Sequence, residues 1–348
     1  MTYAKNLKTI LEERILKKVL VTGGAGYVGC NLVPKLLDAG HAVTVYDLMF
    51  FGDEGLPKNH PNLKVIKGDI RDIGRYSDAV HGMDAIIHLA CISNDPSFEL
   101  DSGISKSINY DCFEPFVVAT KKAGVKRFIY ASTSSVYGVS EAPEVTEDHP
   151  LVPLTDYNKY KGLTEPLLLK HQSDDFTTVI IRPATVCGYS PRTRLDLSVN
   201  ILTNLAVNKR KITVFGGSQK RPNIHVDDIS DLYVQLLDMP KEKIAGETFN
   251  AGYQNHTIAE LAQMVRKVVE EEFPEKAPIE IDTSPSNDLR SYHVNSDKIT
   301  KKLGFRPRRN VEDAVRGLCK AFKEGKLPNS LEDSKYFNIR RMKEVSIQ

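Results

Sequence analysis

Short apolar runs alternate with helix-like patterns through the first half of the chain. Six runs have the length and aliphatic content of buried strands: Val19–Thr22, Ala42–Tyr46, Leu63–Lys67, Ala85–His88, Arg127–Ala131 and Thr177–Ile181. Apolar positions at helical spacing predict helices at Tyr27–Ala39, Ile104–Ala123 and Asp156–His171. Buried strands that alternate with helices form a parallel sheet, which helices cover on both faces. The pattern therefore predicts an α/β fold with a doubly wound parallel sheet.

The rhythm changes beyond Arg182, where proline and glycine become more frequent. Three further stretches have helical patterns, Leu195–Asn208, Thr257–Glu272 and Val311–Lys323, with short strands between them. Such a region predicts a smaller C-terminal α/β lobe that closes over a ligand at the edge of the sheet. We expect a leader helix at 1–16, a nucleotide-binding domain at 17–182 with a return segment at about 224–250, a substrate-binding domain at 183–223 and 251–325, and a tail at 326–348.

The stretch Lys17–Asp47 has the order strand, glycine-rich turn, helix, strand, acid. Glycines in such a turn let the backbone approach a pyrophosphate, which the N-terminus of the following helix receives. We expect this contact from Gly23, Gly26, Tyr27, Val28 and Gly29. An acid at the end of the second strand, here Asp47, accepts hydrogen bonds from ribose hydroxyls and favours NAD over NADP. The stretch predicts a Rossmann-type domain with NAD as its cofactor.

Composition narrows the set of partners. Lys and Arg number 47 and Asp and Glu number 45, a net charge of +2, which gives no reason to expect nucleic acid or an anionic membrane as partner. The five cysteines are scattered without metal-ligand spacing, so we expect reduced thiols, no metal site and a cytoplasmic protein. No apolar run approaches the roughly 18 residues of a membrane span.

Tyr157 and Lys161 lie four residues apart at the start of a predicted helix and therefore share one face. An ammonium group about 4 Å from a phenolate stabilises it by up to about 4 kcal/mol, which would lower the tyrosine pKa by roughly three units. Tyr157 could then take a proton from a substrate hydroxyl while NAD takes the hydride. Thr133, just after the fifth strand, could bind the same oxygen, although a hydroxyl in such a turn often satisfies only local backbone.

Together these motifs resemble the extended short-chain dehydrogenase/reductase family, whose members modify nucleotide sugars. The resemblance covers about residues 18–317 and includes Gly68-Asp69-Ile70, His88-Leu89-Ala90 and Thr133 followed by Ser-Ser-Val-Tyr-Gly. It implies that Asp69 and Ile70 lie near the adenine and that Ala90 lies beside the cofactor. It also implies catalysis by Thr133, Tyr157 and Lys161, contact of Arg182-Pro183 with both ligands, and substrate contacts by Ser134, Ser135, Thr185, Arg221 and Arg290, with Arg221 on the substrate diphosphate.

Departures from the family's motifs reduce the number of reactions that the resemblance allows. Ser134 and Ser135 stand where dehydratases and decarboxylases of this family carry acids, so we expect a sugar site without extra acids. The pattern is most like that of the UDP-glucose 4-epimerases, and it implies epimerisation at C4 of a nucleotide hexose through a 4-keto sugar. The alternatives are a C4 oxidoreductase that releases its cofactor, another reaction of the family, or a non-catalytic NAD-binding protein. Pairing of the helices at 104–123 and 156–171 implies a homodimer. The sugar and the nucleotide base stay open.

Overall fold

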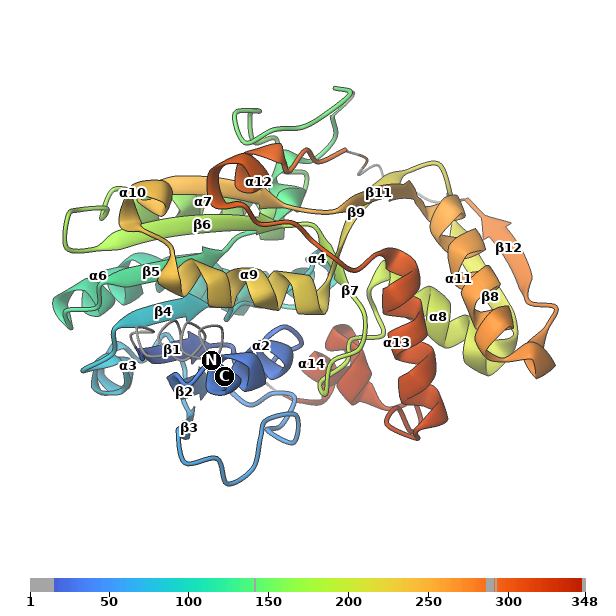
Figure 1. Cartoon of the computed structure of the whole chain (residues 1–348), viewed down its shortest axis with the longest axis horizontal. Helices are drawn as coiled ribbons and strands as arrows, with labels where there is room; N and C mark the ends of the chain where they lie inside the picture. Colours follow the sequence, from blue (N-terminus) through green and yellow to red (C-terminus); the bar gives the residue numbers. More distant parts are fainter. Residues whose placement is uncertain (1–15, 141, 286–290, 292, 346–348) are drawn as a thin grey trace, which may run out of the picture.

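The computed structural model describes residues 16–140, 142–285, 291 and 293–345 (Figure 1). Its largest element is a seven-stranded sheet with all neighbours parallel, in the order β10-β6-β5-β4-β1-β2-β3. The strands are β1 (Lys18–Thr22), β2 (Ala42–Asp47), β3 (Leu63–Lys67), β4 (Ala85–His88), β5 (Arg127–Ala131), β6 (Thr177–Pro183) and β10 (Glu247–Ala251). This is the doubly wound strand order, so the predicted Rossmann-type fold is confirmed.

Alternate side chains of the strands pack against two different layers of helices. Val19 and Val21 of β1 face a core formed with helices α2 (Gly29–Asp38) and α9 (Val226–Asp238), whereas Leu20 faces the opposite core. That second core contains residues of α3 (Ile73–Val80), α6 (Phe113–Lys122) and α7 (Asp156–Leu169). Burial on both faces explains why the strands are aliphatic throughout instead of alternating with polar residues.

The prediction of one continuous helix at 104–123 is wrong. The chain forms α5 (Ser102–Lys106), then a π-helical turn η1 (Ser107–Asp111), and then α6. Inside the π turn, the side chain of the buried Asn109 accepts a hydrogen bond from Ile92 N (2.8 Å) and donates one to Ile92 O (2.9 Å). These two bonds to the loop after β4 fix the position of Asn109, and the wider turn accommodates it.

A smaller lobe lies beyond the C-terminal edge of the large sheet (Figure 1, right). Its strands are β7 (Thr185–Cys187), β9 (Lys220–His225) and β11 (Gln254–Thr257) in one sheet and β8 (Lys211–Phe215) with β12 (Glu280–Ser284) in another. Helices α8 (Ser198–Lys209), α11 (Ile258–Glu272) and α13 (Val311–Lys323) pack together in its core. The helix α11 begins with a capping box between Thr257 and Glu260, which fixes its first turn.

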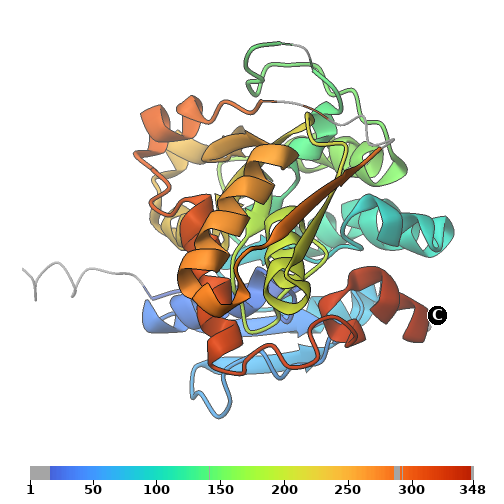
Figure 2. The same cartoon turned by 90° about the vertical axis from the view of Figure 1, so that its right-hand side faces the viewer.

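The last described residues return to the large sheet. A short turn η4 (Ser334–Tyr336) leads into α14 (Asn338–Glu344), and Figure 2 shows this red segment beside the blue and cyan part of the chain. The remaining short elements are α4 (Asp95–Glu99), η2 (Ser134–Tyr137), α10 (Lys241–Ile244), η3 (Pro274–Lys276) and α12 (Asp297–Leu303). Apart from Leu16, the predicted leader helix falls outside the described residues. Within the described part, no helix is long and apolar enough to cross a bilayer.

Candidate active site

The glycine-rich turn lies at the C-terminal edge of the sheet and admits no side chain at two of its glycines. Gly23 has φ +74°, and a Cβ there would lie 2.6 Å from Ala90 N. A Cβ on Gly29 would lie 2.4 Å from Gly24 O. Because backbone cannot move away as a flexible side chain can, the turn is held directly against the loop after β4 and the first turn of α2. It forms one wall of a cavity of about 270 Å³, the inner cavity.

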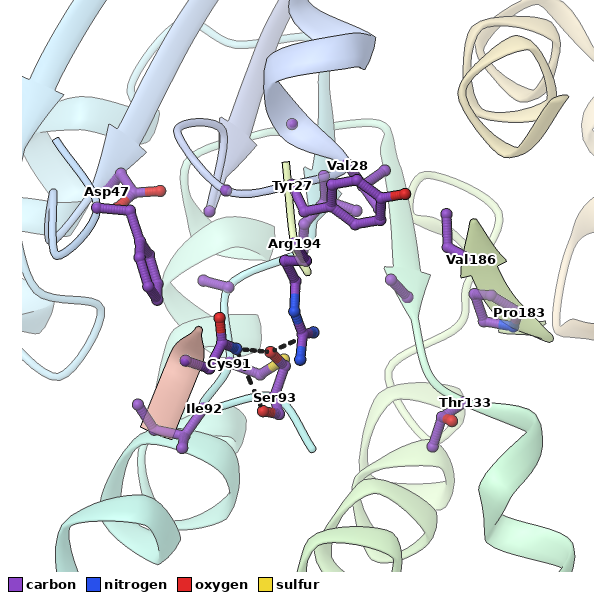
Figure 3. A pocket seen from close by; sticks show the side chains of 18 of the residues that line it. Tyr27, Val28, Asp47, Cys91, Ile92, Ser93, Thr133, Pro183, Val186 and Arg194 are labelled. Atoms are coloured by element: carbon purple, nitrogen blue, oxygen red, sulfur yellow. Dashed lines mark hydrogen bonds between the residues drawn. The ribbon is translucent and has the colours of Figure 1, made fainter. Parts of the chain in front are cut away.

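Asp47 ends β2 and lines the inner cavity (Figure 3). Its carboxylate accepts hydrogen bonds from Ala25 N (3.0 Å) and Met49 N (2.8 Å). Burial raises the pKa of Asp47, while these two backbone donors and the nearby Arg192 act in the opposite direction. The carboxylate is therefore anchored between the glycine-rich turn and the loop after β2, where it can still accept hydrogen bonds from a ligand.

The other residues predicted to bind the cofactor fall into two groups. Gly26, Tyr27, Val28, Ile70 and Ala90 line the inner cavity. The phenol of Tyr27 donates to Gly188 O (2.6 Å), so this side chain fastens the glycine-rich turn to the smaller lobe.

Asp69 is different, because it does not line the cavity. Its carboxylate pairs with the guanidinium of Arg71 at 2.6 Å. The implied contact of Asp69 with the adenine stays a prediction, whereas Ile70 lines the cavity wall.

Thr133 and Tyr157 lie where the inner cavity meets a second cavity of about 470 Å³, the outer cavity, and they line both. Thr133 follows β5, and its oxygen accepts a hydrogen bond from Ser135 N (3.1 Å). That bond satisfies local backbone but leaves the hydroxyl proton available to a ligand. Tyr157 lies in the first turn of α7, whose N-cap is Thr155. Two hydroxyl groups from different elements thus meet at the junction of the cavities.

Burial raises the pKa of Tyr157 well above its ordinary value, and Cys91 and Asp95 add to that effect. The lowered pKa predicted from Lys161 is therefore wrong for this structure. Lys161 is buried, its ammonium donates to Ala131 O (2.5 Å), and it lies 4.4 Å from the ring centroid of Tyr130. Desolvation of the phenolate is the largest cause of the raised pKa of Tyr157, and the ammonium of Lys161 is directed at other groups.

The predicted substrate residues do not all reach the outer cavity. Ser135, Thr185 of β7 and Arg221 of β9 line it. Ser134 is wrong as a contact, because it lines neither cavity and is only 1% exposed in the short turn η2. Arg290 lies outside the described residues.

Of the segment Arg182-Pro183, which the resemblance places at both ligands, only Pro183 lines the cavities. Arg182 is buried and pairs with Glu165 at 2.6 Å. The carboxylate of Glu165 also accepts from Ser132 Oγ (2.6 Å), and Arg182 Nη1 donates to Tyr137 Oη (2.6 Å). This buried network ties α7 to β5 and β6 directly behind Thr133 and Tyr157.

Four charged residues that line the cavities have no counterpart in the sequence-based expectations: Arg192, Arg194, Asp95 and Asp196. Arg194 lines both cavities, and its guanidinium pairs with Asp196 (2.9 Å). Figure 3 shows its second bond, which it donates to Ser93 Oγ (3.1 Å). Asp95 lines the outer cavity and accepts a hydrogen bond from the Thr155 hydroxyl. The expectation of a sugar site without extra acids is therefore wrong. Charged residues recur at every second position from 192 to 196, and this pattern is the sequence feature that could have indicated a functional role for Arg194.

Comparison with known proteins places this geometry in context. The sequence model of the "NAD dependent epimerase/dehydratase family" matches residues 19–252. A UDP-glucose 4-epimerase of Azospirillum brasilense is 28% identical over 86% of this chain and 89% of its own length. A dTDP-glucose 4,6-dehydratase of Streptomyces griseus is 28% identical over 85% of this chain and 91% of its own length. The structure of a UDP-glucuronic acid 4-epimerase from Bacillus cereus, in complex with UDP-glucuronic acid and NAD, superposes with a TM-score of 0.78 at 25% identity, over 88% of this chain and 99% of that one.

Proposed function

Because this chain belongs to the NAD-dependent epimerase/dehydratase family of extended short-chain dehydrogenases, we propose that it is a nucleotide-sugar epimerase. The proposed reaction is inversion at C4 of a nucleotide hexose through a transient 4-keto sugar. One observation carries the proposal: Thr133 and Tyr157 line both cavities, so a sugar held in the outer cavity can bring one carbon to both hydroxyls and to the inner cavity. The matched 4-epimerases support the same assignment.

The inner cavity fits NAD on its own features. The glycine-rich turn leaves its backbone open to a pyrophosphate, Asp47 offers a carboxylate to a ribose, and the cavity extends to Tyr157 and Lys161. When bound there, NAD supplies the acceptor and donor of the hydride. We assign the contacts with it to Gly23, Gly26, Asp47 and Lys161, with Ile70 and Ala90 as apolar walls.

Tyr157 is the proposed base and acid. It takes the proton from the sugar hydroxyl and later returns that proton to the inverted hydroxyl, so protons balance over one turnover. Because burial raises the pKa of Tyr157, its phenolate requires positive charge nearby, and Lys161 and Arg194 are cations that line the inner cavity with it. Thr133 donates its hydroxyl proton to the same sugar oxygen while its own oxygen accepts from Ser135 N.

The outer cavity is proposed to anchor the nucleotide while the sugar turns. Arg221 offers a planar set of donors to a diphosphate, and Thr185 lies on the neighbouring strand of the same sheet. An epimerase must present both faces of C4 to the same cofactor. A firmly held diphosphate and a loosely held sugar meet that requirement.

Asp95 favours a second candidate, 4,6-dehydration. A dehydratase requires a carboxyl group close to the sugar, and Asp95 supplies one from an unexpected position. The matched dTDP-glucose 4,6-dehydratase shows that this reaction occurs among relatives at the same identity.

One experiment separates these reactions. The purified protein is incubated with UDP-, GDP-, CDP- and dTDP-hexoses deuterated at C4, and the products are followed by NMR. Epimerisation inverts C4 and keeps the deuterium in the product sugar. Deuterium that accumulates in NAD in solution identifies an oxidoreductase, and a 4-keto-6-deoxy product identifies a dehydratase. Either of those results would overturn the epimerase assignment. The absence of turnover on every one of these nucleotide hexoses would overturn it as well.

A further inference from the structure

Arg192 is a buried cation in the wall of the inner cavity, near the carboxylates of Asp196 and Asp47 but in direct contact with neither. It is 7% exposed, and among the described residues no carboxylate lies within salt-bridge distance of it and Nε has no hydrogen-bond partner. The other basic residues of this wall have direct partners: Lys161 donates a hydrogen bond to Ala131 O, and Arg194 forms an ion pair with Asp196. A buried guanidinium without a direct ion pair is costly, and an anion bound in the inner cavity beside Arg192 would lower that cost.

The orientation of Arg192 is fixed. Its guanidinium lies 3.5 Å from the ring centroid of Phe51, and Nη2 donates to Asn338 Oδ1 at 2.6 Å. Burial and the neighbouring Arg194 lower the pKa of Arg192 to about 9, which leaves it charged at neutral pH. Because Asp47 and the glycine-rich turn line the same cavity, the anion that reaches Arg192 there is a phosphate group of the dinucleotide.

Asn338 comes from the far end of the described chain. It is buried, lines the inner cavity and joins two loops: its backbone N donates to Asp196 Oδ2 (3.0 Å), and Nδ2 donates to Ser93 Oγ (2.9 Å). One side chain therefore positions Arg192 and connects its loop to the loop after β4.

The residues around Asn338 hold it in place. We call residues 334–345 the C-terminal strap. Arg341 Nε donates to Phe50 O (2.7 Å) in the loop after β2, and Leu195 N donates to Tyr336 O (2.9 Å). Tyr336 is buried against Leu195 and its neighbours. The strap thus touches the loops after β2, β4 and β7, which surround the inner cavity.

We propose that Arg192 and the C-terminal strap form part of the NAD site: Arg192 binds the diphosphate of the cofactor, and Asn338 closes the cavity over it so that NAD is released slowly. This inference rests on the NAD dependence of the family and not on which sugar reaction is catalysed. Its test requires no sugar, so its failure and the failure of the proposed epimerisation are separate results.

The test measures the affinity and release of NADH by fluorescence. Arg192→Met keeps the side-chain length and removes the charge, and it should raise the Kd for both NAD and NADH by roughly tenfold to a hundredfold, the loss expected for a charge-assisted contact. The same variant should keep or raise the unfolding temperature of the NAD-free protein, because it removes an unpaired buried charge. A purely structural role predicts the opposite pair of results.

Asn338→Ala should speed NADH release several-fold. Arg340→Ala is the matched control, because Arg340 lies on the same helix but donates to Leu331 O at the surface, and it should leave release unchanged. Wild-type Kd and release rate in both Arg192→Met and Asn338→Ala would overturn the proposal. So would a loss of affinity confined to NADP(H), since Arg192 would then serve a 2′-phosphate and not the diphosphate.

Discussion

The ion pair of Arg182 and Glu165 gives the sharpest test of how the active site is held. Their side chains are 7% and 5% exposed, and two bonds join them, at 2.6 and 3.0 Å. Removing one partner leaves the other charge buried, which costs about 3–5 kcal/mol. We therefore expect Arg182→Met and Glu165→Leu each to lower the free energy of unfolding by about that amount.

The double variant should lose far less free energy of unfolding than the two single variants lose together. With both charges gone, no unpaired charge is left, and the chief losses are the hydrogen bonds of the pair with Ser132 Oγ and Tyr137 Oη, about 1 kcal/mol each. For a chain of this length the unfolding entropy is about 0.7 kcal/mol/K, so each single variant should melt roughly 4–7 °C below the wild type. The double variant should melt within about 3 °C of it.

Urea denaturation and thermal melts of the four proteins complete this double-mutant cycle. Turnover provides the functional readout, because the network holds α7, which carries Tyr157 and Lys161. Single losses below about 1 kcal/mol, or a double variant as unstable as the two singles combined, would refute the reasoning.

Four further predictions concern the site and the assembly. Tyr157→Phe should lower turnover by about a hundredfold or more while NAD binding stays near wild type; unchanged turnover would contradict its role as base. The wild type should bind NAD more tightly than NADP, and titration of Asp47→Asn should show a narrower gap, since the carboxylate repels a 2′-phosphate. Burial lowers the pKa of His88 to about 3, so between pH 6.5 and 3 only the unfolded chain binds a proton on this imidazole. The free energy of unfolding should therefore fall by about 2 kcal/mol from pH 7 to pH 5. Denaturation of His88→Phe at both pH values should show a weaker dependence. Light scattering should give a dimer mass at micromolar concentration, and Leu163→Asp, at an exposed position on α7, should give a monomer.

Six of the seven strands of the large sheet could be predicted to within two residues, because aliphatic residues dominate most of these runs. The seventh, β10, could not, because its sequence Glu-Thr-Phe-Asn-Ala lacks such a run. The break at Asn109 could not, since it depends on hydrogen bonds to Ile92, which lies in a different loop. Local periodicity contains no information about such partners. The neighbouring helix pattern is strong enough to hide the turn.

The residues of the candidate site also divide into those that the local sequence predicts and those that it does not. Gly23 and Asp47 are set by local geometry, and the structure places both at the inner cavity as expected. Ser134 is buried at the start of the 3-10 turn η2, and the sequence does not reveal which of these neighbouring hydroxyls that turn buries. Asp95 and Asn338 reach the cavities from the first residues of α4 and α14, which are far apart in the chain, so no local motif predicts them.

The two parts of the molecule are joined by several crossings of the chain. It leaves the large sheet between β6 and β7, returns between β9 and α9, and leaves again between β10 and β11. A protease that cuts one of these connections would therefore produce a nicked protein whose fragments stay associated, and neither part could be expressed as one continuous piece. Any opening of the cleft must bend all of these connections together, which favours a small, concerted movement over a swing about one linker.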